Sequence, residues 1–354
     1  MSTNQKNGAL PPIVIDRLRI DPPLLLAPMA GITDLPFRRI CRAYGVGLTV
    51  TEMIASRAVE QGRRRTERMA LIDPDEHPVA IQIAGSDPGY LADAARWAAD
   101  HGADLVDINM GCPVKKVCRQ QAGSALLRDE RQVARLLDAV VAAVELPVTL
   151  KIRTGWDQQS KNVDRIARIA EECGVRMLTV HGRTRSQMFH GHADWHDIGR
   201  AVEAVSIPVI GNGDVVDGAS ALELIRVSGC AGVMVGRAVQ GNPWLLAEVA
   251  AALRGAPPPA PPDREARWAV VRRHMELLAE HHGRFLAGQL ARKHVVWYSR
   301  GLPDAARFRA CFQRLRDWPE QLACAEGYFL YGRLPPSDPL QTVTEAEERD
   351  RSWR

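Results

Sequence analysis

The sequence predicts an α/β protein, a (β/α)8 TIM barrel followed by a smaller all-α helical domain. Eight short apolar runs recur along the chain and are nearly continuous rather than alternating, which is typical of parallel strands buried on both faces. Helical patterns lie between the runs, and this alternation favours a barrel over the alternative, an open doubly wound sheet. The runs are Leu24–Ala27, Leu48–Val50, Val79–Ile83, Leu105–Ile108, Val148–Ile152, Met177–Val180, Val209–Ile210 and Val233–Val235.

One of the intervening helices is clear from its spacing. Its apolar residues recur at i, i+3, i+4, i+7, i+8 and i+11, which places them on one face of a helix. Asp87-Pro88 and Asn242-Pro243 each predict an N-cap followed by proline at the first helical position. The apolar stripe consists of Val133, Leu136, Leu137, Val140, Val141 and Val144.

A change of composition marks the end of the predicted barrel, which covers residues 1–254. Residues 255–263 (GAPPPAPPD) are rich in proline and predict a semi-rigid linker. Residues 264–333 show helix-type periodicity without convincing strands. From Asp263 to Trp318 there are twelve Lys or Arg against six Asp or Glu, a formal charge of about +6. The polar stretch at 334–354 predicts a disordered tail.

The composition excludes several classes of protein. The net charge of +4 is too small to indicate a partner by itself. The seven cysteines include no CxxC pair, which argues against a disulfide framework, a zinc site or an iron–sulfur cluster. The sequence shows no signal peptide and no apolar stretch of membrane-spanning length. We therefore expect a cytoplasmic protein without a metal or a membrane contact, and we expect a monomer.

Glycines and polar side chains lie at the ends of the predicted strands or directly after them, where a barrel has its active site. Glycines after the last two runs would allow close approach of a phosphate, and Arg237 would add a charge-assisted contact. The alternative is that these glycines only make tight turns. The segments are Ala27–Gly31, Gln82–Gly85, Asn109–Pro113, Lys151, His181–Arg183, Gly211–Asp214 and Gly236–Arg237.

Three of these residues carry distinct chemistry. Lys151 lies among apolar neighbours, where an ammonium needs an anionic partner unless it reaches solvent from the strand end. His181 could bind a base, a phosphate or a cofactor ring, or could be a packed polar residue. Cys112 lies in a loop between Gly111 and Pro113, which favours a reactive or proton-donating thiol over a buried apolar one.

In this order and spacing the motifs resemble those of tRNA-dihydrouridine synthases, most closely the bacterial B type. The resemblance covers roughly residues 13–320, and the ordered set is far more specific than any one motif. The matching segments are Ala27–Asp34 (APMAGITD), Asn109–Pro113 (NMGCP), Lys151–Arg153 (KIR), His181–Arg185 (HGRTR), Gly211–Asp214 (GNGD), Val235–Arg237 (VGR) and Gly241–Trp244 (GNPW).

The resemblance implies a barrel that binds FMN and a C-terminal helical domain that binds tRNA. It implies reduction of the C5–C6 double bond of uridine, with Cys112 as the proton donor. Asn109 and Arg183 would lie near the target uracil, and Lys293 and His294 match the pattern of the helical domain. Residues implied to hold the flavin are Pro28, Met29, Ala30, Gln82, Lys151, His181, Asn212, Gly213, Asp214, Gly236 and Arg237.

NADPH is the expected electron donor, and it would use the same flavin face in alternation with RNA. The chain has no GxGxxG pattern and no second βαβ unit for a separate dinucleotide site.

Two segments differ from the family pattern. Cys118 precedes Arg119 where relatives commonly have asparagine, which removes the basis for assigning position 118 a family role. The segment Phe189–Asp194 (FHGHAD) is rich in histidine, and we interpret it as a polar loop rather than a metal site.

Two rival hypotheses fit part of this pattern. A flavin barrel that reduces a small molecule such as dihydroorotate or a dihydropyrimidine would share the barrel and Lys151, but not the basic helical segment. A non-catalytic RNA-binding protein on a barrel without activity would not need Cys112 and Lys151 together.

Overall fold

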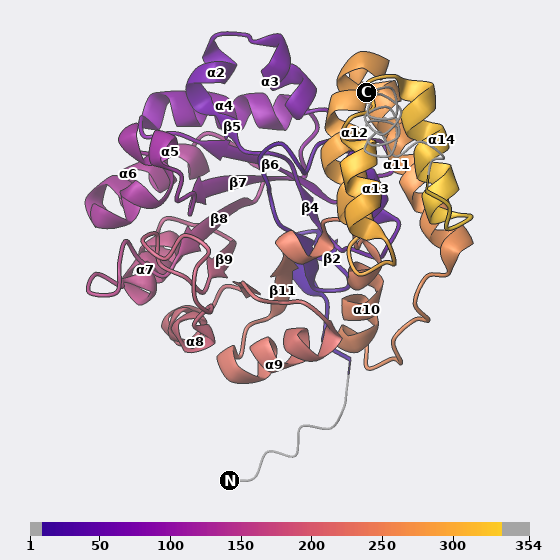
Figure 1. Cartoon of the computed structure of the whole chain (residues 1–354). Helices are drawn as coiled ribbons and strands as arrows, with labels where there is room; N and C mark the ends of the chain where they lie inside the picture. The colour runs from indigo at the N-terminus through magenta and orange to yellow at the C-terminus, as the bar shows by residue number, and fades with distance from the viewer. Residues whose placement is uncertain (1–8, 335–354) are drawn as a thin grey trace, which may run out of the picture. The chain divides into compact units, whose positions relative to one another are not determined.

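The computed structural model describes residues 9–334, and these divide into two compact units. The first comprises residues 9–239 and 243–259, and the second comprises residues 240–242 and 260–334 (Figure 1). The tail predicted at 334–354 lies, apart from Leu334, outside the described residues.

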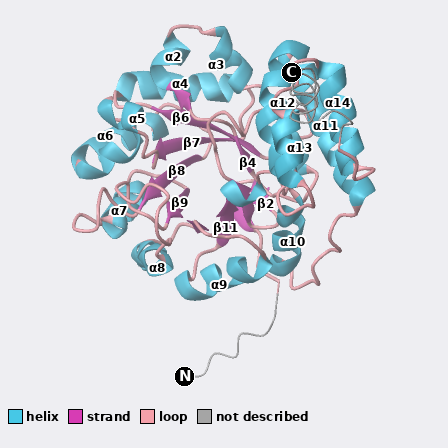
Figure 2. Ribbon diagram, viewed as in Figure 1, coloured by secondary structure: helices cyan, strands magenta, loops and turns pink. Residues whose placement is uncertain are grey.

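The first unit is a parallel (β/α)8 barrel, with strands inside and helices outside (Figure 2). The strand order is β3-β11-β10-β9-β8-β7-β6-β4. A parallel bridge between Leu25 and Leu48 closes the barrel from β3 to β4. The strands are β3 (Leu24–Leu26), β4 (Thr49–Val50), β6 (Val79–Ala84), β7 (Leu105–Met110), β8 (Val148–Arg153), β9 (Met177–His181), β10 (Val209–Asn212) and β11 (Gly232–Val235). All eight predicted strands are present, so the predicted barrel is confirmed.

Three further short strands were not predicted. β1 (Ile13–Ile15) and β2 (Leu18–Ile20) form an antiparallel hairpin, and β5 (Ile54–Ala55) pairs with the end of β6. Each is only two or three residues long, so its pattern is too short to distinguish from a loop.

The helices of the first unit cover the outside of the barrel (Figure 2). The α-helices are α1 (Leu35–Arg42), α2 (Ser56–Glu60), α3 (Arg64–Met69), α4 (Pro88–Asp100), α5 (Lys115–Arg119), α6 (Glu130–Val141), α7 (Val163–Glu172), α8 (Trp195–Ala204), α9 (Gly218–Ser228) and α10 (Trp244–Leu253). Two 3-10 helices, η1 (Gly123–Arg128) and η2 (Arg237–Val239), follow β7 and β11.

Two of the predicted helix features are confirmed and one is wrong. α6 buries Val133, Leu136, Leu137 and Val140 of the apolar stripe but ends at Val141, so Val144 lies beyond the helix. Asp87 caps α4 by accepting a hydrogen bond from the Tyr90 N–H. The prediction that Asn242 caps the next helix is wrong. α10 begins at Trp244, and Pro243 itself occupies the N-cap at φ −65° and ψ −20°, without a side-chain cap.

The register of the barrel brings polar residues together at the carboxyl ends of its strands. Asn109 on β7 lies opposite Lys151 on β8. His181, the last residue of β9, lies opposite both Arg153 on β8 and Asn212 on β10. Because all eight strands are parallel, the segments that follow them meet at this same end.

The second unit is helical. Its helices are α11 (Arg264–His282), α12 (Arg284–Tyr298), α13 (Ala305–Phe312) and α14 (Trp318–Phe329). Phe308 anchors their packing, since its ring stacks on Tyr328 at 4.1 Å between centroids and meets Phe329 edge-on at 5.3 Å. No helix in residues 9–334 is long and apolar enough to cross a membrane.

Candidate active site

Lys151 lies in the interior of the barrel rather than in solvent. Only 8% of the residue is exposed, and Nζ donates a hydrogen bond to Asn212 Oδ1 at 3.0 Å. The Asn212 amide in turn donates to the Met234 carbonyl at 2.8 Å. Burial lowers the pKa of Lys151 to about 8, although nearby Asp107 acts in the opposite direction. The alternative of a strand-end lysine reaching solvent is therefore wrong.

A chain of hydrogen bonds leads from the barrel interior to the Cys112 loop. Gln82 is fully buried, donates to Asp107 Oδ2 at 2.6 Å and accepts from Asn109 Nδ2 at 2.8 Å. Asn109 Oδ1 accepts from the backbone N–H groups of Gly111, at 3.2 Å, and Cys112, at 2.9 Å. Asn109 therefore fixes the turn that presents the Cys112 thiol.

The Cys112 thiol holds its proton at neutral pH. Burial raises its pKa above the ordinary cysteine value, and the positive charges of Arg153 and Lys151 only partly oppose this shift. A thiol in this state has a proton to donate and lacks the charge of a thiolate nucleophile. Cys118 lies beside the same loop and donates a weak hydrogen bond to the Cys112 carbonyl, with Sγ 3.6 Å from the oxygen.

Arg153 is a site residue that was not predicted. Its side chain is 2% exposed, and Nε donates to the Gly111 carbonyl at 3.1 Å. The same guanidinium donates to the carbonyls of Thr184, at 2.8 Å, and Met188, at 2.7 Å. Burial lowers its pKa to about 10. Arg153 thus joins the Cys112 loop to the segment after β9. Its position two residues after Lys151, on the same side of the strand, was the available signal.

His181 is neutral in this surrounding. Burial lowers its pKa well below the ordinary histidine value, and four nearby cations lower it further. The ring is therefore free of charge and able to accept as well as donate a hydrogen bond. The four cations are Lys151, Arg153, Arg183 and Arg237.

Arg183 and Asp214 bind each other, although the sequence assigned them to different ligands. Arg183 NH2 donates to both carboxylate oxygens of Asp214, at 2.7 and 2.8 Å. It also donates to the Gly191 carbonyl at 2.7 Å, while Asp214 accepts from the Ala193 N–H at 2.7 Å. The pair anchors the histidine-rich loop to the strand ends, and the Arg183 residue is only 2% exposed.

The two phosphate-type glycines differ in what requires them. Gly213 has φ +119°, and a Cβ there would lie 2.8 Å from the Cβ of Ala193, so the protein itself requires glycine. A Cβ at Gly236 would lie 3.4 Å from the Cβ of Ala27 and 4.0 Å from Sδ of Met29, which is ordinary contact. The tight-turn explanation therefore suits Gly213 but not Gly236.

The remaining predicted residues of the barrel lie at the same end. Pro28 and Met29 are half-buried after β3, Ala30 is exposed, and the Met29 N–H donates to Thr33 Oγ1 at 2.9 Å. Arg237 is exposed, and its guanidinium lies 4.5 Å from the centre of the Phe189 ring.

Lys293 and His294 lie on α12 of the second unit, with different exposure. Lys293 is half-exposed, with Nζ 5.9 Å from the centre of the Trp297 ring. His294 is 1% exposed, and its ring meets those of His274 and Trp297 edge-on at 4.8 and 5.2 Å. His294 is therefore packed against neighbouring rings rather than presented at the surface.

Among residues 9–334, no group of three or more His, Cys, Asp or Glu side chains could hold a metal ion. The site therefore consists of a protonated thiol, a buried lysine, a neutral histidine and several cations at one end of a barrel.

Comparison with known proteins identifies relatives along most of the chain. The family described as dihydrouridine synthase matches residues 25–329. The tRNA-dihydrouridine synthase B of Pseudomonas aeruginosa is 47% identical over 308 residues, covering 86% of this chain and 92% of the relative. The protein of the same name from Xanthomonas axonopodis pv. citri is 46% identical over 320 residues, covering 90% and 96%. A probable tRNA-dihydrouridine synthase of Rhodobacter capsulatus is 46% identical over 318 residues, covering 90% and 98%.

Proposed function

The chain belongs to the dihydrouridine synthase family and is an enzyme, and from that premise we propose that it reduces the C5–C6 double bond of uridine in tRNA to 5,6-dihydrouridine. We further propose FMN as its cofactor, NADPH as its electron donor and Cys112 as its proton donor. The observation that carries the proposal is the position of the Cys112 loop, which Asn109 and Arg153 hold at the end of the barrel where Lys151 is buried.

The residues present fit an anionic, phosphate-bearing flavin. The cations around His181 make this end of the barrel electropositive, and Lys151 would neutralise negative charge on a reduced ring. A Cβ at Gly236 would fit without a clash, so no contact within the protein requires glycine there. Arg237, the next residue, would contact a phosphate. We propose the eleven flavin residues named from the sequence, with Asp214 acting through Arg183 and the histidine-rich loop.

When bound, reduced FMN supplies the hydride that adds to C6 of the uracil. Negative charge then develops across C5 and the C4 carbonyl, and Cys112 neutralises it by donating its proton to C5. A positioned acid of this kind contributes about 10²–10⁴-fold in rate. Asn109 keeps the thiol in place by accepting hydrogen bonds from the backbone of its loop. Its remaining hydrogen-bonding capacity would bind the substrate. The uridine must leave its stack to reach this site, which costs a few kcal/mol.

We propose that the helical unit supplies part of the tRNA affinity that offsets this cost. Its segment Asp263–Trp318 carries a formal charge of about +6. In this proposal residues 1–254 form the catalytic domain, 255–263 the linker and 264–333 the tRNA-binding domain. Lys293 is its candidate phosphate contact.

The test is to incubate the purified protein with FMN, NADPH and unmodified tRNA and to measure dihydrouridine by nucleoside mass spectrometry. We expect dihydrouridine that depends on all three additions. A yellow protein that oxidises NADPH and reduces free uracil or orotate, but leaves tRNA unchanged, would instead be a small-molecule reductase. A protein that stays colourless with FMN would have no flavin chemistry.

A further inference from the structure

Three segments on the rim of the barrel are locked together beside the Cys112 loop. They follow β7, β8 and β9. The backbone N–H groups of Arg185 and Ser186 donate to the carbonyls of Gly155 and Trp156, both at 2.9 Å. Asn162 Nδ2 donates to the Leu127 carbonyl at 2.9 Å, which connects the second segment to the first. Hydrogen bonds therefore join the three segments of the rim into one continuous surface.

Two guanidinium groups lie over one aromatic ring where these segments meet. The Arg128 guanidinium lies 5.0 Å from the centre of the Trp156 ring, and that of Arg185 lies 4.5 Å from it. Arg128 belongs to the first segment, Trp156 to the second and Arg185 to the third. The stack holds both cations in place without neutralising either of them.

The cations of this rim lack acidic partners. Within residues 9–334, no ion pair involves Lys115, Lys116, Arg119, Arg128 or Arg185. All but Arg185 are exposed. In the same part of the chain, Nε of Arg185 is buried and has no hydrogen-bond partner.

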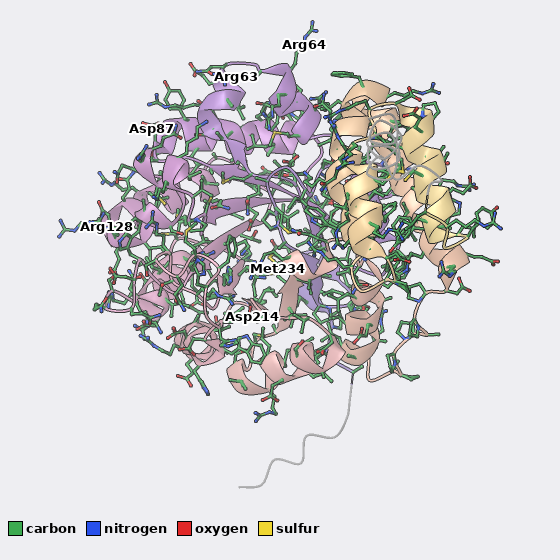
Figure 3. All side chains as sticks on the ribbon, in the orientation of Figure 1. Arg63, Arg64, Asp87, Arg128, Asp214 and Met234 are labelled. Carbon is green, nitrogen blue, oxygen red and sulfur yellow. The ribbon has the colours of Figure 1, made fainter. Side chains whose placement is uncertain are left out.

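Asp157 is an acid that lies close to these cations. Hydrogen bonds from Ser160 and the positive charge of Arg128 lower its pKa, so its carboxylate is ionised. Its Oδ1 accepts hydrogen bonds from the backbone of Gln159 and from the backbone and side chain of Ser160. Figure 3 shows Arg128 at the outer edge of the barrel unit, where its guanidinium lies over the Trp156 ring. Asp157 offsets part of the Arg128 charge, and the five cations still leave the surface with a net positive charge.

We propose that this rim surface, formed by Lys115, Lys116, Arg119, Arg128, Trp156 and Arg185, binds backbone phosphates of the RNA strand that carries the target uridine. The proposal rests on the proposed function for the identity of the RNA. Unpaired, clustered Lys and Arg side chains are the groups that bind phosphates, and an Arg–Trp stack offers a face for a flanking base. Because Lys115, Lys116 and Arg119 follow Cys112 by only a few residues, contacts there orient the strand at the proton donor.

A structural role is the competing explanation. The stack of Arg128, Trp156 and Arg185 would then only brace the segments, and the lysines would only be a solvated face. The two explanations differ in the salt dependence of RNA binding. Each phosphate that the protein no longer neutralises lowers the slope of log Kd against log salt by about 0.7–0.9. A brace that does not touch RNA leaves that slope unchanged.

The experiment measures binding of unmodified tRNA to the FMN-loaded full chain at several salt concentrations, together with melting temperature. The variants are Arg128→Ala, Trp156→Ala, Trp156→Phe and the double change Lys115→Ala with Lys116→Ala. We expect weaker binding and a slope reduced by about 0.7–0.9 for each phosphate that a variant leaves without its cation. Trp156→Phe, which retains an aromatic ring, is expected to bind better than Trp156→Ala.

Arg17→Ala is the matched control. Arg17 is exposed in the hairpin turn between β1 and β2, at the opposite end of the barrel, and among the described residues it has no ion pair. We expect its slope and affinity to equal those of the wild type.

Two results would overturn the rim proposal. One is wild-type affinity and slope in the Arg128 and lysine variants. The other is a lower melting temperature with an unchanged slope, which would assign the stack to bracing. Because binding is measured directly, an unmodified tRNA product with normal binding would refute the proposed reaction but not the rim. A wild-type chain that does not bind tRNA would refute both.

Discussion

The two ends of the barrel differ in the side chains that they bury: those at one end are apolar, and those at the other are polar or charged. At the amino-terminal end the β1–β2 hairpin packs Ile13, Ile15 and Ile20 against the first residues of the strands, all almost completely buried. At the carboxyl-terminal end the same strands present Gln82, Asn109, Lys151, Arg153, His181 and Asn212. One end removes hydrocarbon from water, while the other holds buried polar and charged groups.

This difference explains how the protein stays folded although its candidate active site buries polar and charged groups. Burial displaces the pKa values of Lys151, Arg153, His181 and Cys112, and each displacement records a free-energy cost to the charged form. The apolar end contributes stability that offsets such costs. Residues of the hairpin end should therefore control folding, and residues of the other end should control chemistry.

The largest expected effect comes from the proton donor. Cys112→Ala should retain FMN and a normal melting temperature but lose about 10²–10⁴-fold in the rate of dihydrouridine formation. Single-turnover kinetics with reduced enzyme measures this step. Cys173→Ala, half-buried on the outside of the barrel, is the matched control and should react at the wild-type rate. Full activity of the Cys112 variant would remove the thiol from the mechanism.

The hairpin end should show the reverse pattern. Ile20 is completely buried, so Ile20→Ala should lower the free energy of unfolding by about 2–5 kcal/mol. The kcat/KM of the folded fraction should not change. Val14→Ala, at an exposed position of the same hairpin, should change stability by less than about 0.5 kcal/mol. Denaturant unfolding measures both, and a loss of kcat/KM in folded Ile20→Ala would contradict the division between the two ends.

The cost of burying Lys151 should appear in the pH dependence of stability. Its folded pKa is about 8, below the ordinary value of 10.5, so between these values the unfolded chain holds a proton that the folded chain has lost. Stability from this group therefore rises with pH across that window, by about 3 kcal/mol at about 1.4 kcal/mol per pKa unit. Denaturant unfolding of apoprotein from pH 7.5 to 10.5 measures it. Lys151→Met should lack this rise, and identical curves would disprove the assignment.

The smallest expected effect on folding is at Gly236. Gly236→Ala should fold normally, because the added methyl group makes only ordinary contacts, but should bind FMN about tenfold more weakly, a change of about 1.4 kcal/mol. Gly213→Ala should instead destabilise the protein itself, since its φ is +119° and Ala193 is too close. Flavin fluorescence titration and thermal melting separate the two. Unchanged FMN affinity in Gly236→Ala would place the phosphate elsewhere.

The barrel could be predicted because each of its strands is recognisable from its own short stretch of sequence. Seven of the eight apolar runs contain β-branched residues, and the first, Leu24–Ala27, is rich in leucine. Parallel strands buried on both faces need no partner to be recognised. The hairpin was missed because its strands are three residues long, and their apolar face exists only when it lies against the barrel. Asn242 was wrongly assigned as a cap because the proline after it takes that position instead.

The candidate site was predicted residue by residue but not in its connections. The motifs named Asn109, Cys112 and Lys151, yet nothing in the sequence shows that Asn109 binds the backbone of the Cys112 loop. Arg153 was named only as part of the Lys151–Arg153 motif, and the structure shows it as a buried connection between two segments.

The sequence by itself determined the eight strands of the barrel and most of the residues at its carboxyl-terminal end, because each strand and each motif is a short, local pattern. Only the tertiary structure decided which of those residues bind one another. Arg183 and Asp214 are 31 residues apart and meet because β9 and β10 are neighbours in the barrel. Burial likewise belongs to the packed fold, and it is burial that keeps Cys112 protonated, His181 neutral and the pKa of Lys151 low.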